Sequence, residues 1–87
     1  MDLREKERIR ALLNAAAHGP WIASVEGRDH LAGSNIIMTR TADGSPGEDF
    51  DIVGATAADL DFIASARQDV EKLLHEVERL QRIVDAK

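Results

Sequence analysis

The last third of the chain constrains its fold most, because residues 57–86 contain neither glycine nor proline. Thr56 and Asp59 have the spacing of a capping box at the start of this stretch. The sequence therefore predicts a long helix over about 57–86. Asp69 offers a second cap inside the stretch, so we expect the helix to be either continuous or kinked near 67–70.

From residue 70 onward, the apolar residues of this helix follow a heptad pattern with valine at each a position and leucine at each d position. We call these residues the heptad stripe. A β-branched residue at a with leucine at d favours parallel two-stranded coiled coils. Two flanking apolar residues widen the stripe, so a dimer is the minimum and a higher oligomer stays open. The predicted oligomer interface comprises Val70, Leu73, Leu74, Val77, Leu80, Ile83 and Val84.

The composition explains why the chain is expected to need partners. It has 87 residues, of which 44% are hydrophobic and 3% aromatic, and it has no cysteine. A domain of this size buries only about 60% of the surface of its unfolded chain, which leaves a marginal core. Without disulfides, oligomerisation is the expected remedy. We therefore expect a single small domain over 1–87 that assembles with copies of itself.

A first helix is predicted over 3–17. Asp2 is placed to cap it, and Glu5 follows at capping-box spacing. Apolar residues recur through this stretch at helical intervals. Gly19 is expected to take the left-handed position after the last turn, and Pro20 cannot continue the helix.

The segment between the two helices has strand character. Alternating or β-branched residues predict strands at about 21–26, 34–41 and 50–53. Residues 43–51 hold four acids and no base, and the breakers at 42–49 predict a turn or mobile loop. The expected fold is α+β, with an N-terminal helix, a three-stranded antiparallel meander and a long C-terminal oligomerising helix.

Charge and composition exclude several classes of function. The net charge of −5 disfavours binding to DNA or to anionic lipid. No apolar run approaches the ~20 residues of a membrane span, and the charged start is unlike a signal peptide. We therefore expect a cytoplasmic protein with no membrane partner and no DNA partner.

The sequence contains no catalytic or metal-binding pattern. It has no cysteine and no serine in a G-x-S-x-G elbow, so we expect no enzyme. His18, His30 and His75 lack the short spacing of metal ligands. The acids of 43–51 lack the spacing of a calcium loop. We expect neither a metal nor a cofactor.

If the chain binds an anion, the segment that carries Arg28, His30 and Arg40 is the first place to look. Trp21 is either a stacking platform for a base or, more often, the aromatic side chain that packs a chain reversal onto the core. Arg67 either hydrogen-bonds helical carbonyls or points into an interface.

Two sequence motifs resemble those of a known group of proteins. HGPW at 18–21 looks like the PGPW signature of many small phage and prophage proteins. DLDFIASARQDVEKLLHEVERL at 59–80 looks like their recurrent segment D-A-x-F-I-A-x-A-R-x-D-V-P-x-L-L-x-E-V-E-x-L. The chain thus resembles the Ead-like phage accessory proteins over about a third of its length, with 22–55 outside the resemblance. His18 and Glu71 stand where that family commonly has proline.

The resemblance implies a dispensable phage protein that acts on host biology in the cytoplasm of a bacterial host. Small oligomeric phage proteins without catalytic groups act as sponges, which hold the cyclic-nucleotide signals of bacterial immunity without cleaving them. An anti-defence sponge of this kind would bind the signal in a pocket at an oligomer interface and so serve immune evasion. The alternative is an interaction module that binds a host protein through its coiled-coil helix and sheet. For the sponge, the predicted ligand-binding residues are Trp21, Arg28, His30, Asn35, Thr39, Arg40 and Arg67.

Overall fold

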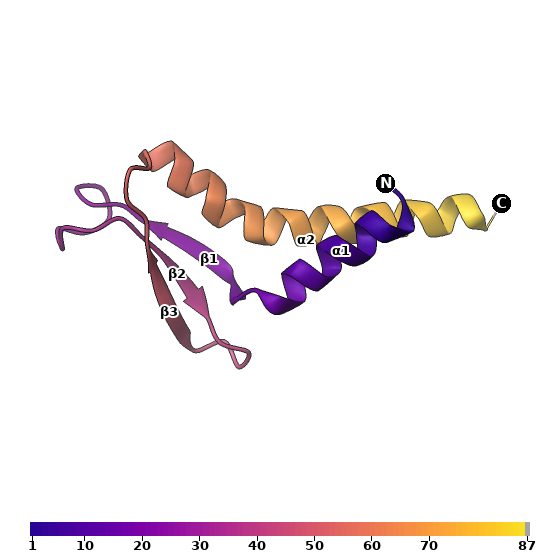
Figure 1. Ribbon diagram of the computed structural model, residues 1–87, viewed down its shortest axis with the longest axis horizontal. Helices are drawn as coiled ribbons and strands as arrows, with labels where there is room; N and C mark the ends of the chain where they lie inside the picture. Colours follow the sequence, from indigo (N-terminus) through magenta and orange to yellow (C-terminus); the bar gives the residue numbers. More distant parts are fainter. Residues whose placement is uncertain (87) are drawn as a thin grey trace.

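The computed structural model describes residues 1–86 and shows a small sheet joined to a pair of helices (Figure 1). The sheet's strands are antiparallel and lie in the order β1-β2-β3, which confirms the predicted α+β fold. The helices run in opposite directions as an arm that projects from the sheet (Figure 1). In chain order the elements are α1 (Leu3–Ala15), β1 (His18–Ser24), β2 (Ile36–Arg40), β3 (Pro46–Asp51) and α2 (Ala57–Asp85).

α2 begins at the predicted capping box. The Thr56 side chain accepts a hydrogen bond from the Asp59 N–H, and the Asp59 carboxylate accepts one from the Thr56 N–H, both at 3.1 Å. The helix then continues to Asp85 without a break, so Asp69 does not cap a second helix. Nothing in this stretch removes a backbone donor. The helix nevertheless changes direction where it leaves the sheet and begins to run along α1 (Figure 1).

α1 ends earlier than predicted, and Gly19 has a different role from the predicted one. The helix stops at Ala15, and the chain leaves it in an extended conformation at Ala16. Gly19 does not take a positive φ. A Cβ at Gly19 would lie 3.3 Å from Gln68 Oε1 and 3.5 Å from Arg67 Cγ. A side chain at Gly19 would therefore crowd Gln68 of α2, and the glycine does not form a left-handed cap of α1.

The core lies between the sheet and the first half of α2. Leu60 of α2 and Ile37 of β2 are fully enclosed, and Val25 is buried beside them. Trp21 and Phe50 are partly buried against this cluster. Their rings meet edge to face with centroids 5.3 Å apart. Trp21 thus packs onto the core where the chain turns from α1 into the sheet.

β1 starts at His18 instead of residue 21, so Pro20 lies within the strand. Proline is tolerated in edge strands and at register irregularities. β1 is an edge strand, and its pairing with β2 shifts register between His18 and Ile22. It ends at Ser24 instead of residue 26.

β2 and β3 also differ from the predicted strands. β2 is shorter than 34–41 and covers Ile36–Arg40. β3 covers Pro46–Asp51 instead of 50–53, so much of the acidic stretch predicted as a loop is a strand. Its backbone pairs with β2, while the Glu48 side chain stays exposed, so the charge bears no burial penalty.

The predicted loop is thereby reduced to a turn around Asp43. The Asp43 carboxylate accepts hydrogen bonds from Thr41 Oγ1 at 2.5 Å and from the Ser45 N–H at 3.0 Å. These bonds, that of the Thr41 hydroxyl foremost, lower the pKa of Asp43 to about 2. The turn is therefore organised around a carboxylate that is ionised at neutral pH.

Candidate functional site

The residues predicted to bind a ligand do not all converge on one cavity. They fall into three groups: the loop between β1 and β2, the middle and far end of β2, and the junction where α1 passes into β1 beside α2. In most cases their polar atoms already have partners within the fold.

Arg28 is held by two carboxylates. Its guanidinium donates to both carboxylate oxygens of Asp61 on α2, at 2.9 and 3.0 Å, and its Nε donates to Asp29 at 3.1 Å. Hydrogen bonding to Arg28 holds the pKa of Asp61 and that of Asp29 below their usual range. All three side chains remain substantially exposed. Arg28 thus links the loop to α2, and a phosphate would have to compete with carboxylates for it.

His30 and Asn35 hold the same loop in place. His30 Nδ1 accepts from the Ala32 N–H at 3.0 Å, and the ring lies 3.4 Å from the Ser24 carbonyl. Asn35 Oδ1 accepts from the Glu26 N–H at 2.9 Å. Both side chains satisfy backbone groups of a loop that has no regular pairing.

Thr39 and Arg40 are neighbours on β2 but point to opposite faces of the sheet. Thr39 is buried toward the core, and its hydroxyl donates to the Glu48 carbonyl at 2.7 Å. Arg40 is half-buried opposite His18 in the β1–β2 register. No hydrogen bond or ion pair within residues 1–86 holds its guanidinium. Thr39 is therefore structural, whereas Arg40 keeps its donors available.

Arg67 binds the end of α1, as one of its two sequence interpretations proposed. Its Nε donates to the Ala17 carbonyl at 3.0 Å, and Nη2 donates to the Leu13 carbonyl at 3.3 Å. Nη1 lies 3.3 Å from Glu71, and only 9% of the side chain is exposed. A cation at the C-terminal end of a helix also complements the helix dipole. Arg67 thus fastens α1 to α2.

Trp21 and Gln68 complete this junction. Trp21 Nε1 donates to the Ala17 carbonyl at 2.9 Å. Gln68 pairs with the backbone of Trp21 in both directions: its Oε1 accepts from the N–H at 2.9 Å, and its Nε2 donates to the carbonyl at 3.1 Å. The Trp21 ring is therefore fixed at its polar atom as well as by the core.

Beside this junction lies a hollow with a volume of about 460 Å³, which we call the junction hollow. Leu13, His18 and Pro20 line one side of it, and Arg67, Lys72 and His75 of α2 line the other. Within residues 1–86, no carboxylate forms an ion pair with His18, Lys72 or His75. Glu71 also lines the hollow, and its carboxylate pairs with Arg67. The cationic and imidazole groups on this concave surface therefore lie beside one carboxylate that already has a partner.

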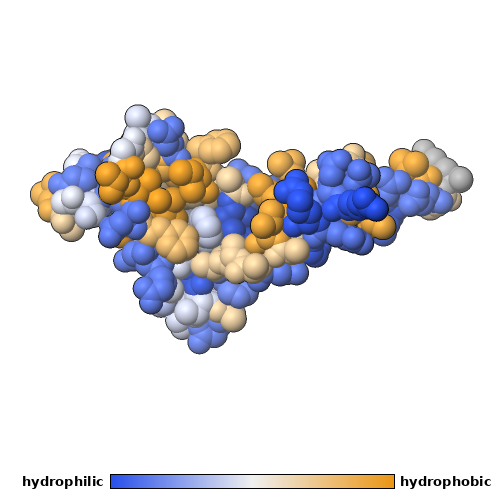
Figure 2. Space-filling view, viewed as in Figure 1, coloured by the Kyte–Doolittle hydropathy of each residue, from blue (hydrophilic) through white to orange (hydrophobic). Residues whose placement is uncertain are grey.

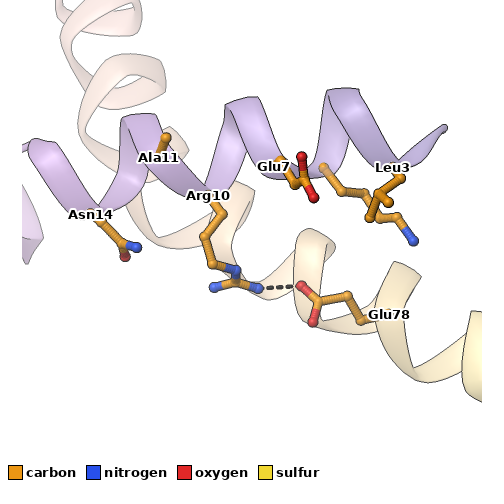
Figure 3. Close-up of a pocket in the computed structure, with 7 residues that line it drawn as sticks. Leu3, Glu7, Arg10, Ala11, Asn14 and Glu78 are labelled. Atoms are coloured by element: carbon orange, nitrogen blue, oxygen red, sulfur yellow. Dashed lines mark hydrogen bonds and ion pairs between the residues drawn. The ribbon is translucent and has the colours of Figure 1, made fainter.

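A second hollow, shown in Figure 3, lies farther along the arm, between α1 and Glu78 of α2. Arg10 reaches from α1 to an ion pair with Glu78 of α2 (Figure 3). Lys6 and Glu7 also line this hollow, so its charges are mixed and partly neutralised. It offers an anion less than the junction hollow does.

The opposite side of the helix pair is apolar. A groove of about 400 Å³ runs between Ile9 and Leu12 of α1 and Ile63 and Val70 of α2, and its surface is almost entirely carbon. We call this groove, together with the heptad stripe, the apolar side. Figure 2 shows that hydrophobic surface recurs along the molecule, over the sheet end and along the helical arm.

Sequence reasoning did not identify Asp61, Gln68 or Lys72 as important. Asp61 and Gln68 form hydrogen bonds with residues that are distant in the sequence, so no local spacing indicates their roles. Lys72 follows Glu71 in a mixed-charge helix, and only the fold shows that it lines a hollow with His18 and His75.

Two further observations describe residues 1–86 as a whole. No helix among them combines the length and the apolar composition that crossing a membrane requires. No group of three or more histidine, cysteine, aspartate or glutamate side chains is arranged there to hold a metal ion. In comparisons with known proteins, the chain matches no protein-family model, no curated protein and no solved structure.

Proposed function

We propose that the protein is a non-catalytic binding protein that sequesters a small phosphate-bearing ligand of the cyclic-nucleotide class in the junction hollow. The observation that carries this proposal is the presence of Lys72, His18 and His75 around one concave surface, where none of the three forms an ion pair within the described chain. The one carboxylate that lines the hollow, that of Glu71, is paired with Arg67. Lysine is a compact cationic donor for phosphate, and imidazoles add further donors when they are protonated.

The hollow also has surfaces that suit the uncharged part of such a ligand. Leu13 and Pro20 provide apolar contact on the side opposite Lys72. Arg67 lines the hollow but is committed to the α1 carbonyls, so it shapes the site and adds positive potential. Of the residues predicted from the sequence, only Arg67 remains in this site.

The biological setting rests on the resemblance to the Ead-like phage proteins alone. Under that resemblance the ligand is an immune signal, and the protein acts in the cytoplasm of a bacterial host as an anti-defence sponge.

Native mass spectrometry with a panel of cyclic di- and trinucleotides tests the proposal, because it detects an intact bound ligand and the number of subunits together. We expect retention of at least one nucleotide, and at least tenfold weaker binding in Lys72→Gln. Lys6→Gln is the matched control, since Lys6 lines the other hollow. Failure to retain any nucleotide, or equal binding by Lys72→Gln, would refute this site.

The same assay distinguishes the sequence-predicted site at the sheet. Arg28→Ala and Arg40→Ala should leave binding unchanged if the junction hollow is the site. Loss of binding in these variants, with Lys72→Gln unaffected, would place the ligand on the sheet instead.

A second candidate is an interaction module that acts on a host protein. The observation that favours it is the open face of the sheet, where Ile22 and Met38 are paired across β1 and β2, with Ile36 beside them. Ile22 is 41% exposed on a face that α2 does not cover. This candidate predicts no nucleotide binding, and capture of one host protein that Ile22→Lys abolishes and Lys72→Gln does not.

A further inference from the structure

We propose that a second copy of this chain covers the apolar side, with the two α2 helices parallel about a two-fold axis. This inference does not depend on the ligand proposal, because the junction hollow lies on the other side of the helix pair. It makes α1 part of the interface and fixes the direction of the partner helix.

The structure lengthens the stripe on which this interface is built. Continued toward the start of α2, the heptad positions fall on Ala66 and Ile63. The sheet does not use these residues, because it packs on Leu60 and Ala64, which lie on a different face of the helix. The stripe therefore runs from Ile63 to Val84 without interruption.

Most of the stripe is exposed, and only Ala66 and Val77 within it are half-buried. Leu73 and Val84 are each 64% exposed, and Leu80 is 47% exposed. Only Leu74, which flanks the stripe, is buried, and it faces the α1 side of α2. α1 thus covers the flank of the stripe and leaves its centre open.

α1 adds a wall to this surface. Leu12 is 60% exposed and lines the apolar groove with Ile9. Phe62 is 75% exposed at the mouth of the same groove. In a parallel pair, Phe62 of the partner lies level with this groove, so an aromatic side chain from each copy can enter the groove of the other.

The amount of exposed surface fits a second copy. Seven large apolar side chains of the stripe and groove are each more than a third exposed, namely Leu12, Phe62, Ile63, Val70, Leu73, Leu80 and Val84. A standard interface buries ~800 Å² on each partner. Monomers rarely leave a contiguous apolar patch of this size uncovered. A copy of the same chain also brings a stripe with the same spacing, which a two-fold axis places in register.

Charge favours the parallel direction. Asp69 and Glu76 flank the stripe on one side, whereas Arg67, Leu74 and Gln81 flank it on the other. In a parallel pair, the acidic flank of one helix faces the non-acidic flank of its partner. An antiparallel pair centred on the stripe would instead bring Asp69 against Glu76 of the partner.

Cysteine cross-linking tests both the partner and its direction, because the chain has no cysteine of its own. In the parallel pair each stripe residue faces its own counterpart, so Leu80→Cys alone and Ile63→Cys alone should each oxidise to a covalent dimer. Lys72→Cys, which lies beside the junction hollow, should not form a covalent dimer. An antiparallel pair would give a covalent dimer only when Ile63→Cys and Leu80→Cys are mixed, and that result would overturn the proposal.

A charge substitution with a neighbouring control tests the interface without cross-linking. Leu73→Asp should convert a dimer to a monomer by light scattering, whereas Lys72→Asp should leave the dimer intact. Leu73 lies outside the core, so circular dichroism should show the same helix content in both variants. A wild-type protein that is monomeric at tens of micromolar, or a Leu73→Asp variant that stays dimeric, would refute the proposal whatever the nucleotide assay shows.

Discussion

The two sides of the α1–α2 pair expose opposite kinds of chemistry, although they share the same two helices. On one side Lys72 and the imidazoles of His18 and His75 surround a hollow without carboxylate partners in the described chain. On the other side a groove and a stripe expose almost only carbon. Charge is strongly hydrated and attracts ions, whereas apolar surface lowers its free energy only by leaving water. This difference is the basis of the two proposals, ligand binding on one side and self-association on the other.

The largest expected effect is at the residue that holds the pair together. Arg67→Ala should lower the free energy of unfolding by roughly 2–4 kcal/mol, because it leaves the Leu13 and Ala17 carbonyls without their charged donor. Nucleotide binding and dimerisation should then be weakened together. Chemical denaturation measures the change, with Arg82→Ala in the exposed last turn of α2 as a control that should barely shift the midpoint. A loss no larger than that of the control would show that the two sides do not depend on this contact.

A leucine pair on α1 separates the two sides more finely. Leu12 and Leu3 are similarly exposed, at 60% and 65%, but Leu12 lines the apolar groove and Leu3 lines the charged hollow of Figure 3. Leu12→Ser should weaken the dimer about tenfold, the effect of about 1.4 kcal/mol of lost apolar burial. Leu3→Ser should not change the dimer constant in sedimentation equilibrium. Equal effects of the two substitutions on the dimer constant would show that α1 is not part of the interface.

Salt should affect the two sides differently. Raising sodium chloride from about 50 to 500 mM shortens the Debye length and should weaken nucleotide binding several-fold. The dimer constant should stay level or improve, because apolar association does not depend on screened charges. Titration calorimetry and sedimentation at each salt concentration provide the two measurements. A dimer that dissociates in salt would indicate that charges, not the stripe, hold it.

The smallest effect is expected at the exposed ion pair of the sheet end. Arg28 holds the pKa of Asp61 below its usual value, so the pair stabilises the fold above the unfolded-state pKa and loses this contribution as pH falls through the folded-state pKa. Asp61→Asn should lower the melting temperature at pH 7 by only about 1–2 °C, because water screens an exposed pair. The difference from wild type should vanish in strong acid. A difference that persists at pH 2 would mean that Asp61 acts through packing.

The starts of the two helices could be predicted from local sequence, whereas the end of α1 and the bounds of the strands could not. The capping box at Thr56 and Asp59 is a local hydrogen-bond pattern, so the start of α2 could be predicted. β3 was misplaced because Pro46 and Gly47 read as loop residues, whereas pairing with β2 decides the strand. The strand signal at Phe50 was real, but it marked the end of β3 and not its start.

The candidate site was harder to predict for the same reason. Arg28 was identified as a basic residue, but its partner Asp61 is brought to it only by the packing of α2 on the sheet. His18 and His75 have no sequence spacing that links them, and the junction of α1, β1 and α2 alone brings them to one hollow. Residues that meet in this way can be identified only once the fold is known.

The contact between Gln68 and Trp21 has a consequence for aggregation. A three-stranded sheet has two open edges, and each is a template on which another chain could add a strand. At the β1 edge the Gln68 amide occupies the outward N–H and carbonyl of Trp21, as a neighbouring strand would. At the β3 edge the run of Glu48, Asp49 and Asp51 would set like charges against any second copy. Each edge of the sheet thus carries a feature that opposes the addition of another strand, an occupied pair of backbone groups on β1 and a row of carboxylates on β3.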